Sequence, residues 1–216
     1  MNGRFLLLFG LAFAAADALA SCAVPPEPAV ISVDYSEARL TIDESQPWSY
    51  LAGLVGKSPN GHQHVYGLTH AEPGYQVRIT PRFGKDWRGG AGCALADIAV
   101  TLQLTELKIY LARDIPDPCR REIVREHENE HVRVWQQYMR IGARLMTVAL
   151  RQELAQPRHY ENAAGAEEDL FARGKTVLEA KFAELAADVR RAQQEIDTPA
   201  SYAQLERRMR ACPPAR

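Results

Sequence analysis

The segment His127-Glu128-Asn129-Glu130-His131 has residue types and a spacing that could hold a catalytic metal ion. On a helix, residues i and i+4 lie one turn apart on the same face, so both imidazoles can reach one cation. Zinc binds imidazole nitrogen at about 2.0–2.1 Å and, with three protein ligands, leaves a position for water. Glu128 lies about 100° around the helix from His127, where it can accept a proton from that water. We therefore predict one zinc ion per chain, with His127 and His131 as ligands and Glu128 as the catalytic base.

The third metal ligand must come from another part of the chain. The metzincin continuation, a Gly three residues and a His six residues after the second His, is absent because Val134 and Gln137 occupy those positions. In an antiparallel helical hairpin, equal counting along both arms places the two histidines opposite a point near residue 190. We therefore expect either Asp197 or Asp188 to complete the site.

Two long helices are expected in the second half of the chain. Asp117 is a suitable N-cap and Pro118 suits the first helical position, so a helix carrying the histidine motif should begin there. It can continue to about Ala155, and a second helix is expected from about Ala166 to Ile196. Apolar residues recur along both at spacings of three and four, as in helices packed on a core.

The first half of the chain is expected to be β-rich. The runs 98–104 and 107–111 alternate between apolar and polar residues at a period of two, which predicts strands. We therefore predict an α+β fold in which an N-terminal antiparallel β-sheet is followed by a long α-helical hairpin. Residues 31–212 would form a single zincin-like domain, β-rich over 31–112 and helical over 117–212, after an extended Pro-rich tether at 21–30.

Residues 1–20 have the pattern of a signal peptide. The apolar run Phe5–Ala16 is too short to span a bilayer and precedes Ala18-Leu19-Ala20, small residues at the positions that signal peptidase reads. This predicts export to the periplasm or the cell exterior. Alternatively, Leu19-Ala20-Ser21-Cys22 resembles a lipobox, and lipidation of Cys22 would anchor the protein to a membrane. Asp17 and the odd cysteine count that lipidation would leave weigh against that alternative.

The four cysteines suit an oxidising compartment. Cys93 and Cys119 flank the two predicted strands that precede the first long helix. We therefore predict a disulfide between Cys93 and Cys119, which leaves Cys22 and Cys212 as the remaining pair.

Several segments together carry a resemblance to known proteins. They are Tyr66-Gly67-Leu68-Thr69, Cys93, Cys119, the His-Glu-x-x-His motif and Ile196-Asp197. The chain resembles zincin-type metallopeptidases, and in particular a bacterial family of secreted proteins of unknown function regarded as zinc-dependent proteases. The match covers most of the mature chain, but only the histidine motif is specific. In that family the terminal Asp precedes a Thr and a His-Gly pair, whereas here no His follows Asp197 and Tyr202 occupies the region. Tyr202 is then a candidate weak ligand or oxyanion donor.

These observations predict an exported zinc-dependent hydrolase, a metallopeptidase with a peptide or protein substrate. The formal net charge of −1 gives no electrostatic basis for binding nucleic acid, and membrane contact is expected only if Cys22 is lipidated. The alternative is a non-catalytic envelope protein in which the motif holds a structural metal, or none, and the helical hairpin binds a partner.

Overall fold

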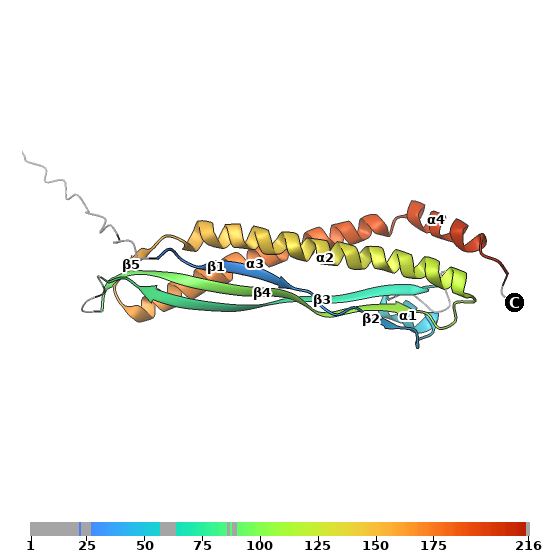
Figure 1. Cartoon of the computed structure of the whole chain (residues 1–216), viewed down its shortest axis with the longest axis horizontal. Coiled ribbons are helices and arrows are strands. Elements are labelled where there is room, and N and C mark those ends of the chain that lie inside the picture. Colours follow the sequence, from blue (N-terminus) through green and yellow to red (C-terminus); the bar gives the residue numbers. More distant parts are fainter. Residues whose placement is uncertain (1–21, 23–26, 57–63, 86, 88–89, 215–216) are drawn as a thin grey trace, which may run out of the picture.

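A computed structural model describes residue 22 and residues 27–56, 64–85, 87 and 90–214 (Figure 1). The predicted signal peptide, 1–20, and much of the predicted tether therefore lie outside the described residues. The elements in chain order are β1 (Ile31–Ser36), β2 (Thr41–Asp43), α1 (Trp48–Leu54), β3 (Gly67–Phe83), β4 (Gly92–Leu111), α2 (Pro118–Leu154), β5 (Arg158–Tyr160), α3 (Ala163–Ile196) and α4 (Pro199–Arg210).

The strands form one mixed sheet around β4, which pairs with all four others. β1 and β2 run parallel to β4, whereas β3 and β5 run antiparallel to it. The predicted antiparallel sheet is therefore wrong, and β5 shows that the helical half also contributes a strand. Alternation at a period of two marks a residue run as a strand but carries no information about the direction of its partner.

β4 is also longer than the sequence suggested. The two alternating runs predicted as separate strands form one strand of 20 residues, and β3 pairs with it from Gly67↔Leu111 to Phe83↔Ala94. The register shifts once, between Glu72 and Pro73 in β3. Pairing continues on both sides of this irregularity, so neither strand ends there. At about 3.3 Å per residue, β4 spans about 60 Å.

The two long helices lie at the predicted places. The side chain of Asp117 caps α2 by accepting a hydrogen bond from the backbone N–H of Arg120 at 3.0 Å, and Pro118 occupies the first turn. α2 and α3 pack antiparallel to each other along one face of the sheet (Figure 1). A Cβ at Gly142 would lie 2.7 Å from the Leu185 side chain, so this glycine allows the two helices to approach closely.

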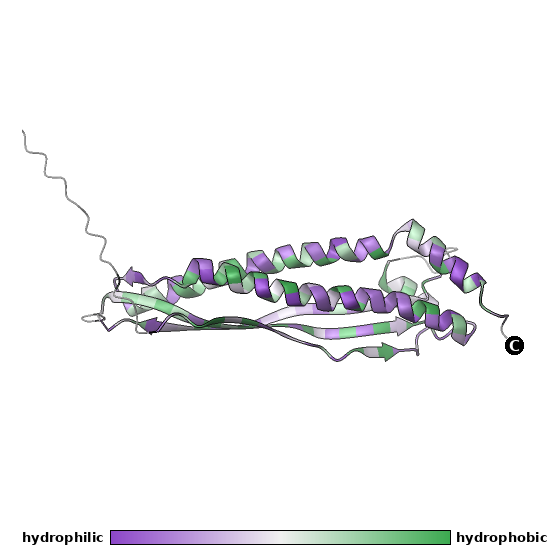
Figure 2. Cartoon of the chain, turned by 45° about the horizontal axis from the view of Figure 1, so that its top comes forward, coloured by the Kyte–Doolittle hydropathy of each residue, from purple (hydrophilic) through white to green (hydrophobic). Residues whose placement is uncertain are grey.

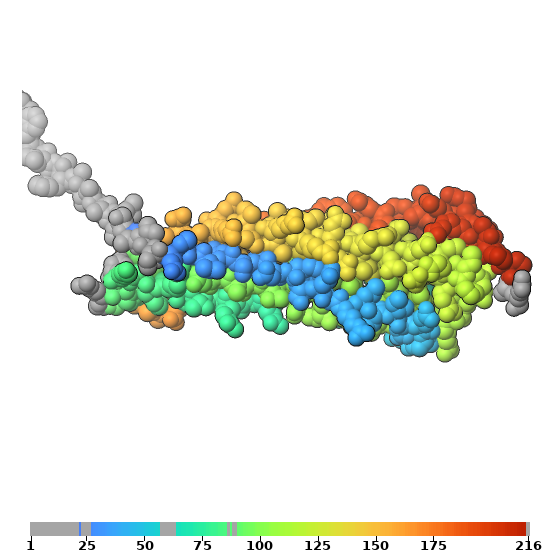
Figure 3. Space-filling view, in the orientation of Figure 1, coloured from blue at the N-terminus to red at the C-terminus, as the bar shows by residue number. Residues whose placement is uncertain are grey.

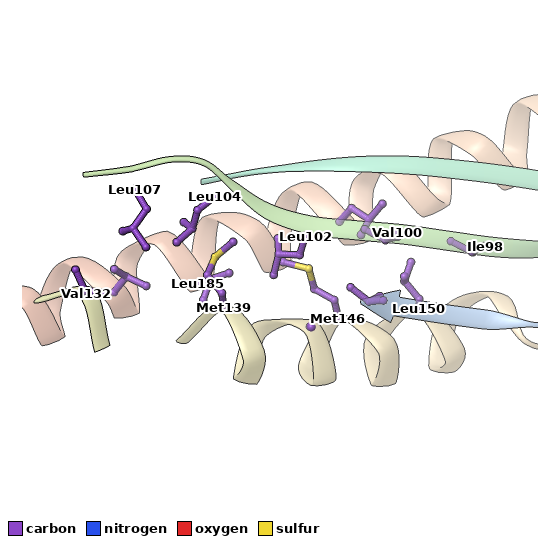
Figure 4. Close-up of a cluster of buried hydrophobic side chains, with 14 of the residues drawn as sticks. Ile98, Val100, Leu102, Leu104, Leu107, Val132, Met139, Met146, Leu150 and Leu185 are labelled. Atoms are coloured by element: carbon purple, nitrogen blue, oxygen red, sulfur yellow. The ribbon is translucent and has the colours of Figure 1, made fainter. Parts of the chain in front are cut away.

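The core fills the space between the sheet and the helical hairpin. Polar and apolar residues share the surface of both long helices (Figure 2), and β1 lies between α2 and the longer strands in the space-filling view (Figure 3). β4 contributes alternate side chains to this core, and α2 and α3 cover them (Figure 4). The labelled core residues are Ile98, Val100, Leu102, Leu104, Leu107, Val132, Met139, Met146, Leu150 and Leu185.

The four cysteines, all among the described residues, form two disulfides, Cys22–Cys93 and Cys119–Cys212. The predicted Cys93–Cys119 bond is therefore wrong. Cys93 lies at the start of β4 and Cys119 follows its end, and the length of this strand separates them. Two disulfides indicate an oxidising, non-cytosolic location. Of the helices in the described ranges, none has a stretch long and apolar enough to cross a bilayer.

Candidate metal centre

α2 brings the two histidines of the motif together on one face, as their spacing predicts. Nε2 of His127 and Nε2 of His131 each lie 3.3 Å from the same oxygen, Oδ1 of Asp197. Asp197 is the C-cap residue of α3, so the end of the second long helix supplies the carboxylate. The two imidazole rings are nearly perpendicular, at 87°, and both nitrogens face the carboxylate.

The three side chains could together hold a metal ion. Ligand atoms 2.0–2.1 Å from a tetrahedral centre lie about 3.3–3.4 Å apart, and the two measured nitrogen–oxygen distances are 3.3 Å. Two imidazole nitrogens and a carboxylate oxygen are also ligands that zinc commonly takes. Between the two predicted carboxylates, Asp197 reaches the histidines, whereas Asp188 forms an exposed ion pair with Arg191.

Gln193 orients His131 from the facing helix. Its Nε2 donates to the backbone carbonyl of His131 at 3.1 Å, and its Oε1 faces Nδ1 of the same residue. Because the amide donates through its nitrogen, its oxygen must accept, and Nδ1 of His131 therefore carries a proton. With a metal bound, Nε2, the nitrogen that faces Asp197, would offer its lone pair to the ion, whereas without one it carries a proton and donates to Asp197. A hydrogen bond of this kind to the outer ring nitrogen is usual for histidines that bind metals.

Glu128 is buried beside the two histidines. Its exposed fraction is 4%, and the hydroxyl of Thr69 on β3 donates to its Oε2 at 2.8 Å. A Cβ at Gly67 would lie 2.4 Å from Oε1, so β3 leaves room for this carboxylate only because residue 67 is glycine. Burial raises the pKa of Glu128, and the nearby His131 and Thr69 offset only part of that effect. A carboxyl with a raised pKa suits proton transfer near neutral pH.

Asp197 is the carboxylate of the site with a lowered pKa. Burial alone would raise its pKa, but hydrogen bonds from His127, His131 and Tyr202 outweigh burial and hold that pKa well below its usual range. The same carboxylate raises the pKa of His131 against the opposing effect of burial. Burial and the hydrogen bond to Asp197 raise the pKa of Tyr202. The site therefore carries a fixed negative charge where a cation would bind.

The site is closed on the sheet side and open on the side of Asp197. The two histidine side chains are almost buried, whereas Asp197 and Tyr202 have exposed fractions near two fifths, at 41% and 42%. The solvent-exposed side of the site is therefore the junction between α3 and α4.

Two other groups of metal-ligand types occur among the described residues, and both are poorer candidates. Cys119 and Cys212 lie near Asp117 but are bonded to each other, so their sulfurs are not thiolate ligands. His70, Glu72 and Glu106 gather on the strands, but the Lys108 ammonium lies 2.6 Å from Glu106 and occupies the position of a counter-ion.

The sequence did not assign roles to three residues that shape the site: Gly67, Thr69 and Gln193. Gly67 and Thr69 belong to a segment quoted for the family resemblance, which implied no role for either. Gln193 lies four residues before Asp197, on the same face of α3, and this spacing could have indicated it.

A scan against protein-family models, a search of curated proteins and a search of solved structures each found no match to this chain. The functional argument therefore depends on the geometry of the site.

Proposed function

We propose that this chain is a zinc-dependent hydrolase that acts on peptides or proteins outside the cytosol. The observation that carries the proposal is the convergence of Asp197 Oδ1 on Nε2 of both His127 and His131, at 3.3 Å each. The buried Glu128 beside them supplies the general base that such a site needs. The choice of a peptide substrate comes from the resemblance to zincin-type metallopeptidases.

The metal ligands, Glu128 and Thr69 have separate roles in this proposal. Zinc held by the three ligands would supply a Lewis acid and a bound water with a pKa near 7. Glu128, with its pKa raised by burial, is the residue that would accept a proton at its carboxylate and donate it to a leaving amine. Thr69 fixes one oxygen of Glu128 and so the direction in which the carboxylate accepts the proton.

We also propose that the protein is periplasmic or secreted and carries no lipid anchor at Cys22. The Sγ atom of Cys22 is bonded to Cys93, and one sulfur cannot form both a disulfide and a thioether to lipid. The two disulfides and the signal-peptide pattern of residues 1–20 support export.

The proposal predicts that Glu128→Gln removes peptide hydrolysis but not zinc. Loss of the general base should lower kcat by about 10²- to 10⁴-fold, while the three ligands remain. Zinc content by atomic absorption, together with turnover of a broad peptide library, measures both. Glu130→Gln, an exposed carboxylate two residues further along α2, is the matched control and should leave both unchanged.

His127→Ala should lose the zinc itself, since two remaining ligands bind the ion weakly. A wild-type protein that binds no zinc when purified without chelator would contradict the proposal. A wild-type protein that binds zinc but cleaves nothing in the library would favour the non-catalytic envelope protein with a structural metal.

A further inference from the structure

Tyr202 contacts the oxygen on which the candidate zinc site depends. Its hydroxyl donates to Oδ1 of Asp197 at 2.8 Å, and this is the oxygen that both histidines face. The Tyr202 ring also lies beside the His127 ring, with centroids 5.8 Å apart. Since Tyr202 is 42% exposed, core packing does not account for this position.

Asp197 needs such a partner because the helix does not hold it. It is the C-cap residue of α3, with φ −89° and ψ 44°, where the regular helix has ended. Hydrogen bonds to a ligating carboxylate fix its rotation and tune its charge, and their loss typically costs a factor of about 10–100 in metal affinity. Tyr202 supplies such a bond from the first turn of α4.

α4 itself is weakly packed. Within this 12-residue helix, all of which the structure describes, no residue is buried. It extends from the metal centre back toward the start of α2 (Figure 1). Besides the ring contact between Tyr202 and His127, α4 is joined to α2 by an ion pair between Arg208 and Glu126 and by the disulfide between Cys119 and Cys212 just beyond its end. An exposed ion pair contributes little, so the disulfide is the stronger link.

We infer that Tyr202 is a positioning residue for the ligand Asp197, and that the Cys119–Cys212 disulfide keeps it there by holding α4 against α2. This inference rests on the proposed zinc site. It differs from the oxyanion role considered from the sequence, because the phenol acts on the carboxylate ligand and contacts no substrate.

The first test measures zinc affinity by competition with a chromogenic chelator. Tyr202→Phe keeps the ring and removes the hydroxyl, and it should weaken zinc binding by about 10–100-fold with an unchanged melting temperature of the zinc-free protein. Tyr50→Phe, at a similarly exposed tyrosine on α1, should bind zinc as wild type does. Equal affinity of Tyr202→Phe and wild type would overturn the inference while leaving the proposed function intact. Absence of zinc binding by wild type would overturn both.

The second test uses the other disulfide as the matched control. The paired substitution Cys119→Ser with Cys212→Ser should weaken zinc binding by a similar factor, and adding Tyr202→Phe should then cause little further loss. The paired substitution Cys22→Ser with Cys93→Ser should leave zinc affinity unchanged. Equal effects of the two pairs on zinc affinity would overturn the role of the Cys119–Cys212 bond. If that variant fails to fold, Tyr202→Phe in the intact protein still decides the role of the phenol.

Discussion

Gln193 links the two long helices at the candidate metal centre through a single amide group. The amide oxygen accepts a hydrogen bond from the His131 ring, and the amide nitrogen donates to the His131 backbone carbonyl. Rotation of the His131 ring or of the Gln193 amide therefore breaks a hydrogen bond. The proton on Nδ1 is therefore held in place before any ion arrives. A ligand that is already oriented loses less conformational entropy when it binds a metal.

Replacing Gln193 with Leu should weaken zinc binding by about 10–100-fold, because His131 loses the partner that fixes its ring and tautomer. Isothermal titration of the zinc-free protein measures the change. Gln194→Leu, at the exposed neighbouring position, is the control and should bind zinc as wild type does. Similar affinities for the two variants would show that the amide does not support the site.

At this scale the sequence predicted which residues of α2 come together, but not the residues from other elements that contact them. His127, Glu128 and His131 could be placed because the geometry of one helix fixes residues four apart. The sequence left two candidates for the third ligand, Asp188 and Asp197. Counting residues along a helical hairpin gives the position of a residue along the helix axis but not the direction in which its side chain points. The apolar stripe of α3, with Leu185 and Val189, fixes that direction in the structure.

At the scale of elements, the contact between β3 and α2 depends on one residue without a side chain. A Cβ at Gly67 would lie 2.6 Å from the Val124 side chain and closer still to Glu128. Because residue 67 is glycine, β3 can approach α2 closely at this point, and this approach buries Glu128.

Gly67→Ala should therefore displace Glu128 or the strand, costing about 1–3 kcal/mol of unfolding free energy and most of any hydrolytic activity. Gly74→Ala is the control in the same strand, where the nearest atom to an added Cβ lies 3.8 Å away, an ordinary contact. Urea denaturation of both variants gives the comparison. A Gly67→Ala protein as stable as Gly74→Ala would contradict the close approach.

The sequence located most elements but misjudged how the strands combine. Thr105 interrupts the alternation of β4 and was expected to separate two strands, yet the pairing with β3 continues on both sides of it. A pair of short strands would have brought Cys93 near Cys119, whereas one continuous strand separates them. The error in strand length thus produced the error in disulfide pairing.

At the scale of the whole molecule, one core extends along β4 and the helical hairpin. Such a core should unfold as a unit, so a cavity far from the metal centre lowers the stability of the whole chain.

Leu150→Ala tests this, because Leu150 is fully buried under the sheet, with an exposed fraction of 0%. The substitution should lower the unfolding free energy by about 2–5 kcal/mol in a single transition. Leu145→Ala removes the same atoms from a side chain on α2 that is 56% exposed, and it should change stability by about 0.5 kcal/mol or less. Two separate transitions in the Leu150→Ala protein would show that the core is divided.

The order of the disulfides along the chain has a consequence for biogenesis. The first cysteine pairs with the second and the third with the fourth, so the two covalent loops neither overlap nor enclose each other. When a polypeptide enters an oxidising compartment with its amino end first, the second cysteine arrives while only the first is unpaired. The fourth cysteine likewise arrives when only the third is unpaired. Oxidation in order of arrival then yields the native bonds directly, and the slow reshuffling that crossed or nested bonds require becomes unnecessary.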